Sequence, residues 1–74
     1  MDIDNLVHMA NRIGEFFQAM PDHDEAAQGV AQHLRRYWEP RMRRDLLAHV
    51  DAAQGHGLAP LVLDALRGHR ALLA

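Results

Sequence analysis

The chain has 74 residues and a formal net charge of −2, and it contains no cysteine, lysine, serine or threonine. It therefore cannot form a disulfide or a thiolate metal site, and of the usual nucleophiles only carboxylates, histidine and tyrosine remain. A chain of this length has room for one small core, which gives a net stability of roughly a few kcal/mol. We predict a single domain over residues 1–74 that benefits from a partner.

The N-terminal stretch MDIDNLVH has neither the basic segment nor the long apolar segment of a signal peptide. No apolar run approaches the length needed to cross a bilayer. Hydrophobic residues make up 49% of the chain, which is enough for a packed core. The sequence thus predicts a soluble, cytoplasmic, globular protein with no membrane segment.

The first predicted helix covers Asp4 to Met20 and begins with Asp2 or Asp4 as its N-cap. Its apolar residues recur at helical spacing, which predicts an amphipathic helix with one buried face. These residues are Leu6, Met9, Ala10, Ile13, Phe16, Phe17 and Met20.

A second strip of the same helix contains Val7, Asn11, Gly14 and Gln18. Glycine in a helix interior costs about 1 kcal/mol relative to alanine. Gly14 therefore suggests that another backbone packs closely against this strip, in this chain or in a partner. A neutral surface glycine is the alternative. We retain the strip as a second candidate partner interface.

The second predicted helix follows the break at Pro21, because Asp22 and Glu25 have the spacing of a capping box. It runs to about Trp38, and Tyr37 and Trp38 fall near opposite edges of its apolar arc. The two aromatic side chains could contact different neighbours, or both could pack in one core.

Pro40 lacks an N–H and disfavours the helical conformation at Glu39, so the second helix must end and a third must begin at a corner. Met42, Leu46, Leu47, Val50 and Ala53 are expected to face inward, and the third helix should end near residues 55–57. A fourth helix should follow Pro60, weakened at Gly68. We predict an all-α bundle of three to four short antiparallel helices with a proline-containing corner between the second and third.

Charge is unevenly distributed, with net −5 over residues 1–32, +3 over 33–49 and zero over 50–74. Arg35 and Arg36 close the second helix, where the helix dipole favours cations. The dipole disfavours arginines that open the third helix by a few tenths of a kcal/mol each. An anionic partner could explain them, so we predict a partner interface that comprises Arg35, Arg36, Tyr37, Trp38, Pro40, Arg41, Met42, Arg43 and Arg44.

Two alternatives stand beside this prediction. Arg41 and Arg44 could form a solvated, ion-paired face with Asp45 and Asp51. Arg43, at the edge of the apolar face, could extend along the core or meet a carboxylate.

No constellation of residues indicates catalysis, cofactor binding or metal binding. None of the six histidines is four residues from another, which is the spacing that places two imidazoles on one helical face. The arginines with Tyr37 and Trp38 could instead contact nucleic acid. The isoelectric point of about 6.3 and the acidic first half disfavour an autonomous nucleic-acid-binding protein.

Two segments, LVHMANRIGEFF from Leu6 to Phe17 and HLRRYWEPRMRRDLLAH from His33 to His49, resemble the signature blocks of the delta subunit of NAD-dependent formate dehydrogenase. The matching residues are Met9, Ala10, Asn11, Ile13, Gly14, Phe16 and Phe17 in the first block, and Trp38, Pro40, Arg41, Met42 and Arg43 in the second. Tyr37 lies where the family is expected to have phenylalanine or tyrosine, so this position varies only mildly from the family pattern. After residue 57 the sequence shows no specific likeness to the family, apart from the segment Leu-Ala-Pro-Leu-Val at residues 58–62.

The resemblance implies a small accessory subunit of a cytoplasmic complex that oxidises formate to carbon dioxide and reduces NAD. In that family the alpha subunit carries a molybdenum or tungsten pterin and iron–sulfur clusters, and the beta and gamma subunits carry FMN and further clusters. The delta subunit itself carries no known cofactor. We therefore expect binding to the alpha subunit, support of its assembly, stability or cofactor maturation, and no active site. A homodimer of the isolated chain is a further alternative.

Overall fold

The computed structural model describes residues 2–74, and all regular secondary structure within them is helical. This confirms the predicted all-α class. The helices are α1 (Ile3–Phe17), α2 (His23–Tyr37), α3 (Pro40–Ala53), α4 (Pro60–Gly68) and α5 (Arg70–Leu73).

The first two helices begin at the aspartates that the sequence indicates. The Asp2 carboxylate accepts the backbone N–H of Asp4 at 3.0 Å, so Asp2 is the N-cap of α1. The Asp22 carboxylate accepts the N–H groups of Asp24 and Glu25 at 2.8 and 3.2 Å. Each cap satisfies donors that the first turn of a helix leaves without a partner.

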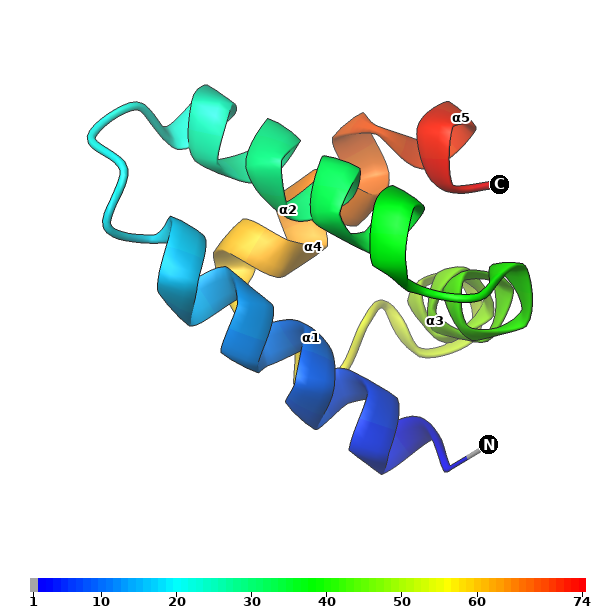
Figure 1. Ribbon diagram of the computed structural model, residues 1–74. Coiled ribbons are helices and arrows are strands. Elements are labelled where there is room, and N and C mark those ends of the chain that lie inside the picture. Colours follow the sequence, from blue (N-terminus) through cyan, green and yellow to red (C-terminus); the bar gives the residue numbers. More distant parts are fainter. Residues whose placement is uncertain (1) are drawn as a thin grey trace.

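The chain turns sharply between α2 and α3, as predicted. Trp38 and Glu39 have extended backbone conformations, with ψ of 142° and 149°, and Pro40 is the first residue of α3. Figure 1 shows α1 and α2 running in opposite directions, with α3 viewed almost along its axis. The antiparallel arrangement therefore describes α1 and α2, whereas α3 crosses them because the corner redirects the chain.

The last predicted helix is divided in two. His69, with φ of −123° and ψ of 32°, interrupts it one residue after Gly68, so that α4 and α5 are separate helices. The break turns the chain and brings Leu73 into the core, where it is 1% exposed.

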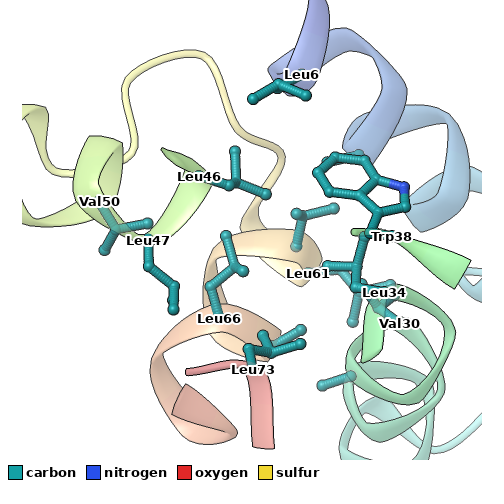
Figure 2. Close-up of a cluster of buried hydrophobic side chains, with 14 of the residues drawn as sticks. Leu6, Val30, Leu34, Trp38, Leu46, Leu47, Val50, Leu61, Leu66 and Leu73 are labelled. Atoms are coloured by element: carbon teal, nitrogen blue, oxygen red, sulfur yellow. The ribbon is translucent and has the colours of Figure 1, made fainter. Parts of the chain in front are cut away.

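All five helices contribute to one core (Figure 2). The largest fully buried side chains are Leu6, Val30, Leu34, Leu46, Val62, Leu66 and Leu73. The indole of Trp38 points into this cluster, and only 7% of the residue is exposed. Packing of these apolar side chains, each contributing about 1.5–3 kcal/mol when fully buried, holds the helices together.

Candidate interaction surfaces

The inner side of the corner contains a buried arginine. Arg43 is 5% exposed, and within residues 2–74 it is the one charged residue in the core. Its Nε donates to the carbonyl oxygen of Leu73 at 3.2 Å, and its Nη1 donates to the carbonyl oxygens of Arg35 at 3.2 Å and Trp38 at 2.7 Å. One guanidinium thus connects α2, the corner and the end of α5.

These acceptors explain why a cation is stable there. Arg35 lies in the last turn of α2 and Leu73 is the last residue of α5, where carbonyl groups lack intrahelical partners. The guanidinium therefore meets the negative end of the α2 dipole and a free carbonyl group at the end of α5. Arg43 begins on the unfavourable N-terminal turn of α3, but its charge lies at the favourable ends of other helices.

Two of the sequence-predicted interface residues are corrected by these contacts. Trp38 and Arg43 pack inside the domain and are not available as a surface anchor or as a charge for a partner. For Arg43, contacts within the domain explain an arginine at the start of the third helix without an anionic partner. Of the two expectations for its side chain, the carboxylate partner is wrong, because the guanidinium extends into the core and donates to backbone carbonyl groups.

The outer side of the corner carries exposed cations. Within the part of the chain that the structure describes, no carboxylate lies within ion-pairing distance of Arg35, Arg36, Arg41 or Arg44. Asp51, which the sequence suggested as an ion-pair partner on this face, instead pairs with Arg70 at 2.6 Å. The expected ion-paired face is therefore not formed.

The remaining corner residues differ in exposure. Tyr37 is 65% exposed, and the Arg36 guanidinium lies over its ring at 5.6 Å from the ring centre. Pro40 is exposed, and Met42 is half-buried against the core. Tyr37 is therefore the aromatic residue of the corner that a partner can reach.

The second candidate strip is partly covered by the chain itself. The Asn11 amide donates to the carbonyl oxygen of Gly57 at 3.0 Å and accepts the N–H of Ala59 at 2.9 Å. These two bonds fix the segment that joins α3 to α4 against the middle of α1. They satisfy backbone groups that no helix can satisfy.

Gly14 lies in the contact between α1 and α4. A Cβ atom at Gly14 would come within 2.6 Å of the Val62 Cγ2 atom, so glycine permits the close approach of α4. Close packing at Gly14 thus occurs within this chain, although the group that contacts the glycine is the Val62 side chain and not a backbone. Val7 is half-buried near Gly57, whereas Gln18 is exposed and lines a surface hollow together with Asn11 and Gly14, so part of the strip stays open to a partner.

A row of aromatic side chains on α1 and α2 is the feature that sequence reasoning missed. It comprises Phe16, Phe17, His33 and Tyr37, which we name the aromatic ridge. The ring centres are 5.2 Å apart for Phe16 and Phe17, 6.1 Å for Phe17 and His33, and 4.8 Å for His33 and Tyr37.

Phe16 is 76% exposed, although periodicity placed it on the buried face of the first helix. The prediction was wrong because the buried line of α1 runs through Leu6, Ala10 and Gly14, each four residues from the last. Residues spaced by four are each displaced about 40° around an α-helix, so the buried line shifts away from the side on which Phe16 lies. Phe16 therefore remains exposed to solvent. The four-residue spacing of His33 and Tyr37, which places them on one helical face, was the available signal.

Two further kinds of feature, a metal site and a membrane-spanning helix, are absent from residues 2–74. These residues contain no group of three or more histidine, cysteine, aspartate or glutamate side chains arranged to hold a metal ion. The helices formed by the same residues include none with the length and apolar character that a membrane crossing requires.

Comparison with known proteins gives one family. The model of the family described as NADH-dependent formate dehydrogenase delta subunit FdsD matches residues 5–66, a span that includes the corner and the aromatic ridge. No curated protein and no solved structure matches the chain.

Proposed function

The chain belongs to the delta-subunit family of NADH-dependent formate dehydrogenases, and from this premise we propose that it is a non-catalytic accessory subunit that binds the alpha subunit. We further propose that it supports the assembly, stability or cofactor maturation of that subunit in the cytoplasm. The molybdenum or tungsten pterin, the iron–sulfur clusters and FMN would then reside in the partner subunits.

The observation that carries the proposed contact is the set of exposed arginines at the corner without carboxylate partners among residues 2–74. Arg41 and Arg44 lie on the first turns of α3, where the helix dipole disfavours them. Unlike Arg43, neither side chain donates a hydrogen bond to a helix C-terminus within residues 2–74. A guanidinium fork is well suited to bidentate contact with a carboxylate, which supports an acidic surface on the partner.

The buried contacts of Arg43 and Trp38 support the same proposal. They fix the backbone of the corner, so that the backbone that carries the arginines and Tyr37 is already in place when a partner binds. Arginine and tyrosine are also among the residues that most often dominate the energy of protein interfaces.

The test is co-purification from cells that make a formate dehydrogenase complex together with a tagged copy of this chain. We expect the alpha subunit, with its beta and gamma partners, to be recovered with the tag. Recovery of the chain alone from a lysate that oxidises formate would contradict the proposal. Metal content and activity of complex made without the chain would then separate a maturation role from support of the finished enzyme.

A nucleic-acid-binding regulator is the second candidate, because the exposed arginines and Tyr37 could contact phosphates and a base. Burial of Trp38 removes the larger of the two aromatic side chains from that surface. Affinity for a duplex or a single strand should fall steeply with added salt if this candidate is correct. Absence of binding at low salt would exclude it.

A further inference from the structure

The aromatic ridge exposes apolar surface that the fold does not use. Phe16 and Tyr37 are 76% and 65% exposed, which makes them the most exposed of the large hydrophobic residues in the described part of the chain. Apolar side chains gathered on a small protein commonly mark a protein interaction site. Because the residues lie along two helices that the core holds in place, the surface is already formed before a partner binds.

The ridge borders a hollow between α1 and α2. This hollow has a volume of about 360 Å³ and is lined by Arg12, Ile13, Phe16, Phe17 and His33. Its walls are chiefly apolar, so it is suited to an apolar side chain.

A glycine fixes the base of the ridge. A Cβ atom at Gly29 would come within 2.6 Å of two ring atoms of Phe17, so the ring lies directly on the backbone of α2. Phe16 packs edge-on against that ring, with an angle of 89° between the ring planes. The hollow therefore has a defined shape, which lowers the entropic cost of filling it.

Cations stand at both ends of the ridge. Arg12 lines the hollow and makes only an exposed contact of 3.6 Å with Glu15, which is a weak ion pair. Arg36 lies over Tyr37 and has no carboxylate partner within residues 2–74. An acidic surface on a partner would complement these two cations.

From these contacts we propose that the aromatic ridge anchors the interface with the formate dehydrogenase alpha subunit. The occupant is a surface of that subunit that presents two groups. An apolar side chain fills the hollow, and a carboxylate pairs with Arg36 at the other end of the ridge. The inference rests on the proposed function, and it extends the interface from the arginines of the corner, through Arg36 and Tyr37, onto α1.

The test measures the affinity of the purified chain for formate dehydrogenase complex prepared without it. Phe16→Ala should weaken binding at least about tenfold, as expected for an interface anchor, without lowering the melting temperature. Leu72→Ala is the matched control, because Leu72 is also an exposed apolar residue, at 39%, but lies on α5 outside the family match. It should change the affinity less than about twofold.

The charge component is tested separately. Arg36→Gln should weaken binding and reduce its dependence on salt, whereas Phe16→Ala should leave the salt dependence unchanged. If Arg36→Gln alters neither, the carboxylate in the proposed occupant is wrong.

The outcomes separate this inference from the proposed function. If the unmodified chain and Phe16→Ala bind equally well, the aromatic ridge is not the interface, and the proposed accessory role is unaffected. No binding by the unmodified chain would overturn both. If Phe16→Ala instead abolishes self-association in sedimentation experiments and leaves complex binding unchanged, the occupant is a second copy and the proposal is wrong.

Discussion

The inner and outer sides of the corner place the same kinds of residue in different environments. Trp38 and Arg43 lie in the core, whereas their neighbours Tyr37 and Arg44 are exposed. Residue type alone does not distinguish an anchor of the fold from a residue available to a partner. The side of the helix on which the residue lies makes the difference.

Helix register shows this most clearly for the arginines. Arg43 precedes Leu46, Leu47 and Val50 by three, four and seven residues, so it belongs to the buried row of α3. Arg44 falls outside that row. The comparison predicts that substitutions on the inner side destabilise the domain and that matched substitutions on the outer side do not.

The largest expected effect is that of Trp38→Ala. Removal of a buried tryptophan costs about 3–5 kcal/mol, comparable to the whole stability expected for a chain of this size. The variant should lose most of its helical circular dichroism at room temperature. Trp38→Phe should remain folded with a lower melting temperature, and Tyr37→Ala should cost less than about 1 kcal/mol. Equal losses of stability in Trp38→Ala and Tyr37→Ala would contradict the distinction between the inner and outer sides of the corner.

Arg43→Met is the next test, since methionine fills similar space without donating hydrogen bonds. Three carbonyl oxygens would lose a charged donor, which should lower the free energy of unfolding by about 2–4 kcal/mol. Arg44→Met, the matched control on the next residue, should stay within about 0.5 kcal/mol of the original. Urea denaturation measures both, and a neutral Arg43→Met would show that the carbonyl contacts contribute little.

A smaller effect is expected on the strip that includes Asn11. Asn11→Ala removes the two bonds that fix the segment between α3 and α4 and should cost about 1–2 kcal/mol. Gln18→Ala, at the exposed end of the same strip, should cost less than about 0.5 kcal/mol. Amide hydrogen exchange at Ala59 should be faster in the Asn11 variant. Unchanged exchange there would mean that the segment is held by other contacts.

Local rules explain what the sequence could predict. The caps at Asp2 and Asp22 and the corner at Pro40 depend on residues within a few positions of one another. Two sets of hydrogen bonds that the sequence did not predict join residues that are distant in the chain. Arg43 bonds to Leu73, 30 positions away, and Asn11 bonds to residues more than 45 positions away. Neither contact leaves a periodic signal.

The aromatic ridge was missed for a related reason. Periodicity identifies a broad apolar face, but it does not say which edge of that face a neighbouring helix will cover. Contact of α4 at Gly14 determines that edge, and it leaves Phe16 in solvent. The exposed residue could be recognised only once α4 was placed.

The central claim, that the inner side of the corner holds the fold and the outer side binds the alpha subunit, is tested most directly by reversing the outer charges. Arg41→Glu combined with Arg44→Glu should leave the melting of the free chain nearly unchanged and weaken its association with the alpha subunit by at least about 2 kcal/mol. Arg67→Glu, a reversal at an exposed position of α4, serves as the control for a general charge effect. Association of the doubly substituted chain as tight as that of the original would contradict the claim.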